Sequence, residues 1–390
     1  MLRVFVPLFM AVAAAMVGLG VIAPILPLYV REFGAGGTEL GLVYAAFSIS
    51  RTLWGPLFGR VSDRVGRRRM IAVGLGTYTA VSMLYVLAGN LWQIAAFRFL
   101  HGVASVLVTP IAQAYVGDLT PAGQEGRTMN LFYTSMFVGM ALGPLLGGGL
   151  AQRYGLVAPF FAMGSLSLVA LVGVLALVPE DRRSRARPAP QVPLREVLRS
   201  PLVWGIVVYT ATRGVWRQGF NAFWPLLGTS AGHGEAAVGT VLTAYLVAQA
   251  IFQIPFGYLA DRLPRLPQIA VGGMLAPSVL FFVPTVAGSL PAVLGCSFLI
   301  GVASALGRAS VVALRTERGR THGMGTLAGI QSSAFASGQS LGPVVAGVAH
   351  DLGGTAAPMY LGGALGVVGS LLAVWVAARG GEVGRPPAPA

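Results

Sequence analysis

The sequence predicts an all-α membrane protein with twelve transmembrane helices, arranged as two six-helix halves related by a pseudo-twofold axis. Three observations lead to this fold class. Only 10% of the 390 residues are charged, whereas a soluble domain carries about 25%, and the mean hydropathy is +0.73. Hydrophobic runs follow one another along the chain, each about 20–27 residues long, which is the length that a helix needs to cross a bilayer. Finally, the two halves of the chain resemble each other.

The hydrophobic runs define the expected helices in order. They are unbroken and lack the alternation of barrel strands, and only helices or closed barrels satisfy backbone polar groups in lipid. The first run lies where a signal peptide would, but its apolar stretch is too long and has no convincing cleavage site, so we expect a retained first helix. The expected spans are 4–30, 39–59, 70–89, 91–116, 128–150, 158–178, 202–227, 237–259, 268–288, 290–314, 325–348 and 358–378.

A polar segment divides the series into two parts. Residues 179–200 hold six arginines and four prolines, a composition typical of a linker. We therefore expect an N-terminal six-helix bundle over residues 1–178 and a C-terminal one over 201–380, followed by a cytoplasmic tail over 381–390. The end of the linker, residues 194–199, is a candidate for a short helix on the membrane surface.

Motifs of the first half recur in the second at a nearly constant offset. Residues 99–105 read FLHGVAS and residues 298–304 read FLIGVAS, an offset of 199. The same offset relates Gly139, Gly143 and Pro144 to Gly338, Gly342 and Pro343, and an offset of 198 relates Gly59, Asp63 and Arg64 to Gly257, Asp261 and Arg262. A parallel repeat of this kind is a transporter architecture, with the substrate site between the halves near the membrane midplane.

The distribution of arginine predicts the orientation. All 27 basic residues are arginine and the net charge is +14. With the N-terminus inside, 20 arginines fall on inner segments, five lie within helices, and only Arg31 and Arg153 fall on outer loops. By the positive-inside rule both termini are cytoplasmic. We expect a multi-pass protein of the inner (cytoplasmic) membrane of a bacterium, whose basic surface faces anionic lipid and not nucleic acid.

Several classes of function are excluded by the residues that the chain lacks. Without lysine there is no Walker A loop, no kinase site and no Schiff-base chemistry, so ATP-driven transport is excluded. The single cysteine, Cys296, permits neither an intramolecular disulfide nor a thiolate metal cluster. The sequence contains no pattern of a nucleophile with a neighbouring base, so we do not expect an enzyme. We expect no cofactor and no metal site, because the loop histidines lack ligand spacing: His233, His322 and His350.

The loop between the second and third runs carries a specific motif. Residues 59–69 read GRVSDRVGRRR, and residues 257–262, GYLADR, form a weaker second copy. The chain here resembles the major facilitator superfamily, and the resemblance extends over nearly its whole length. A plain topology signal made of basic residues is the alternative interpretation of this loop. The resemblance implies a cytoplasmic latch that controls alternating access, with Asp63, Arg64, Arg67 and Asp261 as its residues.

Two further motifs favour an exporter. Residues 139–148, GMALGPLLGG with Gly143 and Pro144, are similar to the antiporter motif of this superfamily. Within residues 17–27, the pair VG at 17–18 is followed after five residues by PILP at 24–27. This arrangement is similar to a motif of the twelve-helix drug:proton antiporters of the superfamily. Small residues permit close helix packing and proline bends a helix, so ordinary membrane packing would explain either motif alone.

The segment 94–102 resembles the superfamily motif whose arginine has been linked to proton coupling. Arg98 is that arginine, and His101 stands where glutamine is usual. Alternatively, Arg98 binds carbonyl groups of the first helix and holds the bundle together. The unperturbed pKa of a histidine side chain lies near neutral pH, so His101 is a candidate proton carrier, with Glu32 as the next candidate. A plain hydrogen-bonding role for His101 is the alternative.

Polar residues at helical spacing predict a cavity. An arginine at a helix centre costs roughly 2.5–3.5 kcal/mol and is therefore a functional candidate. For Arg51 we favour a structural role. All thirteen acidic residues lie in loops or near helix ends, so the cavity should be electropositive and should favour anionic, zwitterionic or neutral substrates over lipophilic cations. The candidate cavity residues are Arg213, Arg217 and Asn221, then Tyr245, Gln249 and Gln253, and Tyr44 with Arg51.

These observations together predict a secondary transporter of multidrug type. We expect it to export small amphipathic molecules by alternating access, driven by a proton or other ion gradient, and a monomer suffices for this mechanism. One alternative is an exporter of narrow specificity for a sugar, nucleoside or organic anion. Another is a receptor that has kept the fold and lost transport.

Overall fold

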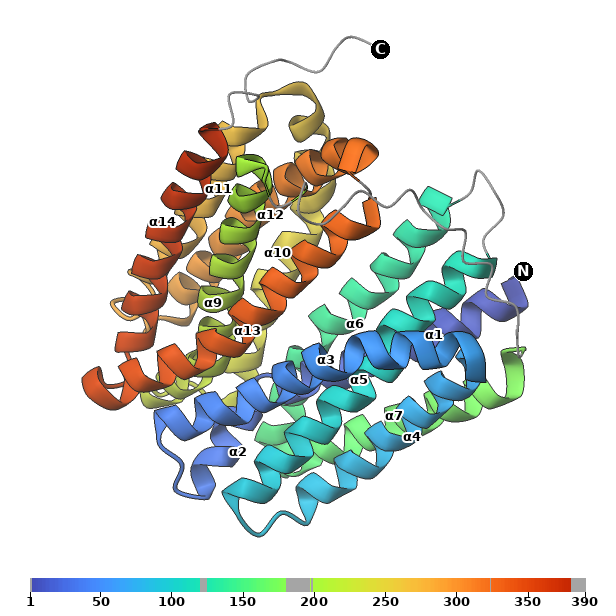
Figure 1. Ribbon diagram of the computed structural model, residues 1–390. Coiled ribbons are helices and arrows are strands. Elements are labelled where there is room, and N and C mark those ends of the chain that lie inside the picture. Colours follow the sequence, from blue (N-terminus) through green and yellow to red (C-terminus); the bar gives the residue numbers. More distant parts are fainter. Residues whose placement is uncertain (1, 120–124, 180–196, 198, 323, 380–390) are drawn as a thin grey trace. The chain divides into compact units, whose positions relative to one another are not determined.

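The protein is helical throughout the part that the computed structural model describes, which is residues 2–119, 125–179, 197, 199–322 and 324–379 (Figure 1). Over these residues there are thirteen helices and no strand. They form two compact units, which we describe separately.

The first unit contains the helices of the N-terminal half together with residues 233–243. Helix α1 packs against α6 and α7, and α5 packs against α3 and α4. Its core is formed by buried side chains such as Leu8, Tyr78, Tyr115 and Phe132. The helices are α1 (Leu2–Ile22), α2 (Leu26–Glu32), α3 (Gly37–Val65), α4 (Arg67–Val86), α5 (Leu91–Leu119), α6 (Glu125–Tyr154) and α7 (Ala158–Leu177).

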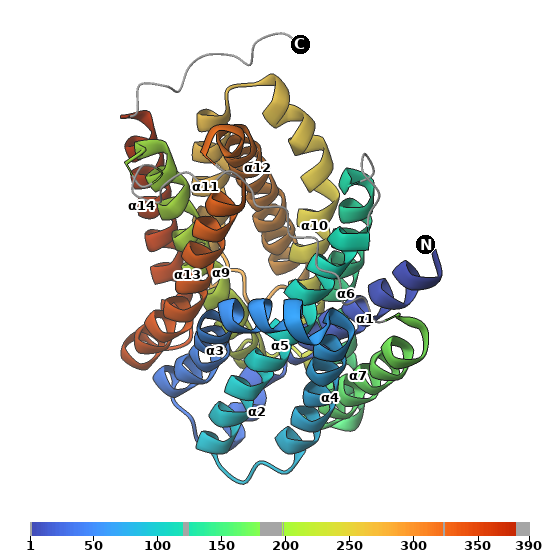
Figure 2. The same ribbon diagram turned by 45° about the vertical axis from the view of Figure 1, so that its right-hand side comes forward.

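The second unit contains the remaining helices. Helix α9 lies between α13 and α14, and α11 packs against α12 and α14 (Figures 1 and 2). Leu202, Ile206, Ile269 and Val311 belong to its apolar core. The helices are α9 (Pro201–Ser230), α10 (Glu235–Arg262, of which the part from Ala244 belongs here), α11 (Arg265–Leu280), α12 (Leu290–His322), α13 (Met324–Gly353) and α14 (Ala357–Ala378).

The expected first helix is broken. Helix α1 ends at Ile22, α2 begins at Leu26, and the two are bent by 46°. Pro24 has no N–H, and its ring would clash with the carbonyl of Gly20 in a continuous helix. The Gly20 carbonyl instead accepts from the N–H of Ala23 at 3.1 Å, the short pattern of a helix end.

The expected span 268–288 is also only partly helical. Helix α11 ends at Leu280, and a series of turns follows up to Gly288. Pro284 stands four residues after Leu280, so its ring would clash with the Leu280 carbonyl if the helix continued. The N–H of Val283 reaches that carbonyl at 3.3 Å instead, which closes a tighter turn.

Not every expected span is apolar enough to be recognised as one. Among the described residues, α4, α5, α6, α7, α10, α12 and α14 are long and apolar enough to cross a membrane, and the bent pair α1 and α2 adds an eighth span. The chain is therefore a multi-pass membrane protein. The helices α3, α9 and α13 have 29, 30 and 30 residues. At a rise of about 1.5 Å per residue, each is longer than the hydrocarbon core of a bilayer is thick. Their polar residues lower their hydropathy.

The internal repeat is visible in the helix packing. In the first unit, a Cβ added to Gly139 would meet the carbonyl of Ala13 on α1. In the second unit, a Cβ added to Gly338 would meet the carbonyl of Ala211 on α9. Ala13 and Ala211 are 198 residues apart, so each half brings its first and fifth spans together at equivalent positions. Glycine is required there because the backbones approach closely.

Some expectations lie outside the described residues. These are most of the linker 179–200 with its candidate surface helix over 194–199, and the tail 381–390.

Candidate functional site

Arg98 lies in a cage of aromatic rings in the first unit. It is on α5 and only 4% exposed. Its guanidinium carbon is 5.1 Å from the ring centroid of Tyr44 and 4.8 Å from that of Phe47, both on α3. The Tyr44 hydroxyl donates to the carbonyl of Ala23 at 3.3 Å, so the cage also contacts the break after α1. Within the described part of the chain, Arg98 Nε and Nη1 are buried without a hydrogen-bond partner.

His101 is fully buried one turn further along α5. Its ring lies edge-on to those of Phe47 and Tyr78, with centroids 5.3 and 4.9 Å away. Its Nδ1 is 3.5 Å from the hydroxyl of Tyr85, and Nε2 has no hydrogen-bond partner among the described groups. The structure thus brings Arg98 and His101 together in one aromatic cluster.

Close packing of α3 against α5 positions this cluster. A Cβ on Gly102 would overlap Ser50 and the carbonyl of Phe47, so only glycine lets the two backbones approach here. Arg51, one turn from Phe47, is partly exposed, and its guanidinium carbon is 5.6 Å from the Phe47 ring. Arg51 and Arg98 therefore share one aromatic ring.

A second group of arginines lies in the C-terminal unit. Arg213 on α9 is 8% exposed, and Arg217 lies one turn later on the same helix. Their guanidinium carbons are 5.6 and 5.9 Å from the ring centroid of Phe335 on α13. Arg217 is also 5.7 Å from the ring of Tyr245 on α10. We call Arg213, Arg217, Tyr245, Gln249 and Phe335 the arginine cage.

Gln249 belongs to the cage by its place on α10, whereas Gln253 and Asn221 are not counted in it. Gln249 is 3% exposed and follows Tyr245 by one turn of α10. Its Nε2 and the Oε1 of Gln253 are buried without a partner among the described groups. Asn221 is half-buried on α9, while its neighbour Phe220 lies edge-on to Tyr245 with centroids 6.4 Å apart.

Two glycines bring α9 and α13 together beside the cage. A Cβ on Gly214 would lie 2.7 Å from the carbonyl oxygen of Phe335 and 3.0 Å from the Cα of Gly338. The residue after Arg213 therefore touches the backbone that carries the Phe335 ring. This contact explains how one ring comes to lie near two arginines.

The glycine motif on α6 is a packing surface. Gly143 meets Gly20 and the carbonyl of Val17 on α1. On another side of α6, the carbonyl of Pro144 meets Gly239 at the start of α10, within the same unit. The predicted residues Gly143 and Pro144 therefore hold α6 between α1 and the first turns of α10.

The predicted latch residues are described only in part. Gly66 separates α3 from α4 with a φ of 107°, a conformation that favours glycine. Arg64 and Asp261 are exposed at the ends of α3 and α10, and Arg67 is 9% exposed at the start of α4. The side chain of Asp63 lies outside the described part of the structure.

Sequence reasoning missed two features. Phe335 was not a candidate, because an aromatic residue on an apolar helix has no distinguishing pattern. Gln268 on α11 was also missed. Its Nε2 lies 3.2–3.3 Å from three carbonyl oxygens and its Oε1 accepts from the hydroxyl of Ser310 at 3.0 Å. The three carbonyls belong to Leu259, Leu263 and Pro264.

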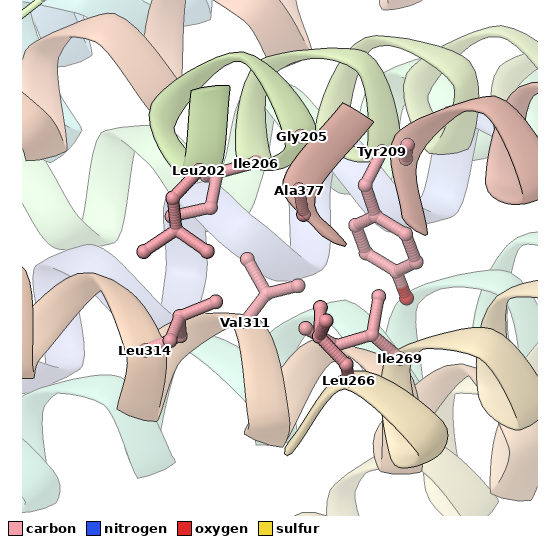
Figure 3. A pocket seen from close by; sticks show the side chains of 10 residues that line it. Leu202, Gly205, Ile206, Tyr209, Leu266, Ile269, Val311, Leu314 and Ala377 are labelled. Carbon is pink, nitrogen blue, oxygen red and sulfur yellow. The ribbon is translucent and has the colours of Figure 1, made fainter. Parts of the chain in front are cut away.

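A small pocket elsewhere in the C-terminal unit is almost wholly apolar. Leu202, Ile206, Val311 and Leu314 line it, and the Tyr209 hydroxyl is the polar group that Figure 3 shows beside it. None of the predicted cavity residues is among its lining residues. The arginine cage and this pocket are therefore separate features of the C-terminal unit.

Comparison with known proteins gives matches along nearly the whole chain. A family model described as Major Facilitator Superfamily matches residues 8–216 and again residues 210–390. Multidrug resistance protein 2 of Bacillus subtilis is 25% identical over 386 residues, covering 95% of each chain. Quinolone resistance protein NorA of Staphylococcus aureus is 23% identical over 374 residues, covering 94% of this chain and 93% of that protein.

A solved structure supports the fold. A bacterial homologue of the human lysosomal transporter Spinster, in an inward-facing and unoccupied conformation, superimposes with a TM-score of 0.80 at 15% identity. The alignment covers 98% of both chains. At this identity the likeness concerns the fold alone.

Proposed function

The chain belongs to the major facilitator superfamily, and from this premise we propose that it is a secondary active exporter of small amphipathic molecules. It acts in the inner membrane of a bacterium, with twelve spans and both termini in the cytoplasm. Two six-helix halves, residues 1–178 and 201–380, rock around a central substrate site. A proton gradient drives the cycle.

One observation carries this proposal: the full-length similarity to two relatives that are named for multidrug and quinolone resistance. A transporter confers resistance by removing the drug from the cell, so export is the direction that we infer. The packing of Gly143 and Pro144 on α6 adds support, because it gives the antiporter-like motif a defined partner at the start of α10.

The residues that we assign to the transport cycle fall into three groups. The arginine cage, with Gln253 and Asn221, contributes to the substrate cavity from the C-terminal unit, and Tyr44 contributes from the N-terminal unit. Arg51 and Arg98 hold the aromatic cluster together through Phe47. Asp63, Arg64, Arg67 and Asp261 form the cytoplasmic latch.

His101 has a hydrogen-bonding role in this scheme. It shares the Phe47 ring with Arg98, and its described neighbours are tyrosines and phenylalanine. A second positive charge beside Arg98 would have no described carboxylate to pair with, and burying an unpaired charge costs several kcal/mol. We therefore do not assign the coupled proton to His101.

The test is dye uptake by energised inverted membrane vesicles that contain the full chain. Rhodamine 123, fluorescein and a neutral dye of similar size serve as cationic, anionic and neutral probes, and vesicles without the protein are the control. We expect uptake of at least one probe above the control, and we expect a protonophore to abolish it. Uptake equal to the control for all three probes, with the protein present and folded, would contradict the proposal.

A second candidate is an exporter of narrow specificity for organic anions, and the arginine cage favours it. Competition separates it from a multidrug exporter. Unrelated amphipathic compounds should inhibit dye uptake by a multidrug exporter, whereas only anions should inhibit uptake by the narrow one. A receptor without transport would show no vesicle uptake, and engineered cysteines would react from only one side of the membrane.

A further inference from the structure

Resting on the transport function proposed above, the geometry points to a binding site for an anionic group in the arginine cage. We propose that Arg213, Arg217 and Gln249 bind the carboxylate, sulfonate or phosphate of an amphipathic organic anion. Phe335 and Tyr245 contact the flat, apolar part of the same molecule. The substrate class is therefore an aromatic or otherwise planar organic acid.

The cage presents donors that lack acceptors. Arg213 Nε and Nη2, Arg217 Nε and Gln249 Nε2 are buried, and none of them has a hydrogen-bond partner among the described groups. Arginine has five N–H donors and no acceptor. Buried donors without partners are costly, and a ligand rich in acceptors removes that cost. An oxyanion offers two or three acceptor atoms at once, which matches four such donors better than a neutral group does.

The two guanidinium groups are held near one point. Both lie within 6 Å of the Phe335 ring centroid, at 5.6 and 5.9 Å. Two like charges repel each other in a medium of low dielectric constant. An anion between or beside the two guanidinium groups attracts both, so the electrostatic interaction energy of the group becomes favourable. The pair is consequently more selective for charge than a single buried arginine would be.

No carboxylate occupies a position from which it would neutralise the pair within the described helices. Every acidic residue of those helices lies within the first or last two turns. Arg213 and Arg217 lie near the middle of α9, which extends from Pro201 to Ser230. An anionic ligand would supply the compensating charge.

The rings beside the arginines indicate the rest of the ligand. Tyr245 is 1% exposed and Phe220 packs edge-on against it. Trp224 stacks on Phe220 with ring centroids 6.4 Å apart. Phe220 and Trp224 thus support Tyr245 from behind. The rings of Phe335 and Tyr245 next to the cationic groups suit a planar acid, whose ring packs on these side chains while its oxyanion binds the guanidinium groups.

The backbone fixes these groups in place. Gly301 on α12 approaches the carbonyl of Tyr245 and the N–H of Gln249, where an added Cβ would lie 2.5 and 3.1 Å away. Gly214 approaches the Phe335 carbonyl from α9 in the same way. The donors and rings thus come from α9, α10 and α13, and glycine contacts set their spacing.

The test is equilibrium binding to the purified full chain in a neutral detergent, without any gradient. The probes are 2-naphthoate and its neutral isostere 2-naphthamide, followed by isothermal titration calorimetry. We expect 2-naphthoate to bind at least about tenfold more tightly than 2-naphthamide, because hydrogen bonds to charged groups are the stronger kind. Arg213→Gln and Arg217→Gln should each lose about tenfold in 2-naphthoate affinity and leave 2-naphthamide binding unchanged. Arg153→Gln, at the end of α6, is the matched control and should behave like the wild type.

Equal binding of the two probes by the wild-type protein would overturn the proposal, and this comparison needs no variant. Variants that melt at the wild-type temperature and keep the preference for 2-naphthoate would overturn it as well. The outcome is separable from the transport proposal. Transport of a neutral dye without any preference for 2-naphthoate would refute the anion site and leave the exporter. Preferential binding of 2-naphthoate without transport of any probe would support the anion site and refute the exporter.

Discussion

The contact between α9 and α13 beside the arginine cage allows a quantitative prediction. In Gly214→Ala, the new Cβ would lie 2.7 Å from the carbonyl oxygen of Phe335 and 3.0 Å from the amide nitrogen of Gln339, whereas ordinary contact begins at 3.4 Å. Both partners are backbone atoms and cannot rotate away. The two helices must therefore separate by about 0.7 Å, and overpacking of this kind costs about 1–3 kcal/mol.

The matched control is Gly329→Ala on α13. A Cβ at Gly329 would meet nothing within 4 Å, so this variant gains only the helix propensity of alanine, up to about 1 kcal/mol. Gly214→Ala gains the same propensity, and the difference between the two variants isolates the packing cost. For a unit of this size we expect Gly214→Ala to melt roughly 2–12 °C below Gly329→Ala.

The assay is the apparent melting temperature of both variants in one detergent, followed by tryptophan fluorescence. Dye uptake in vesicles should fall in Gly214→Ala, because the separation moves Phe335 away from the arginines, and it should not fall in Gly329→Ala. Equal melting temperatures for the two variants would refute the packing argument. A stable Gly214→Ala with wild-type uptake would show that the position of Phe335 does not matter.

Three further predictions concern other contacts. His101→Gln should keep protonophore-sensitive export with an unchanged pH profile, because glutamine still offers Tyr85 a partner and no titrating group is needed there. Gln268→Met should lower the free energy of unfolding by about 1–3 kcal/mol, measured by thermal melting, since several hydrogen bonds at the end of α10 are lost. Gly239→Ala should lower both export and the melting temperature, because its Cβ would meet the carbonyl of Pro144; the packing cost is again about 1–3 kcal/mol.

Each of these predictions has a contrary result. Export by His101→Gln that no longer responds to the gradient would make the histidine the proton carrier. A melting temperature of Gln268→Met equal to that of the wild type would show that its four hydrogen bonds are not needed. Unchanged export by Gly239→Ala would show that the close contact between α6 and α10 is not needed for transport.

Part of this architecture follows from sequence periodicity. Runs of apolar residues predicted the helical character and most helix positions, because lipid requires continuous helices. The four-residue spacing of Arg213 and Arg217 correctly placed them on one face of one helix. The offset between Gly139 and Gly338 predicted that the two halves are repeats, and the structure adds that these glycines meet the carbonyls of Ala13 and Ala211, which are 198 residues apart.

The remainder depends on contacts that no local pattern records. The break at Pro24 and the early end of α11 before Pro284 arise because each proline ring would clash with the carbonyl four residues earlier, and an apolar run does not record this. The assignment of Phe335 to the arginine cage depends on the crossing of α9 and α13, which are far apart in the chain. Gln268 gave no signal, because a single glutamine near a loop resembles any solvated residue.

Transport by the purified chain tests the central claim most directly. The full-length protein is reconstituted into liposomes, a pH gradient is imposed, and movement of a dye across the membrane is followed with and without a protonophore. We predict dye movement that exceeds that of empty liposomes, depends on the gradient and stops with the protonophore. Dye movement equal to that of empty liposomes, for cationic, anionic and neutral probes alike, would contradict the account.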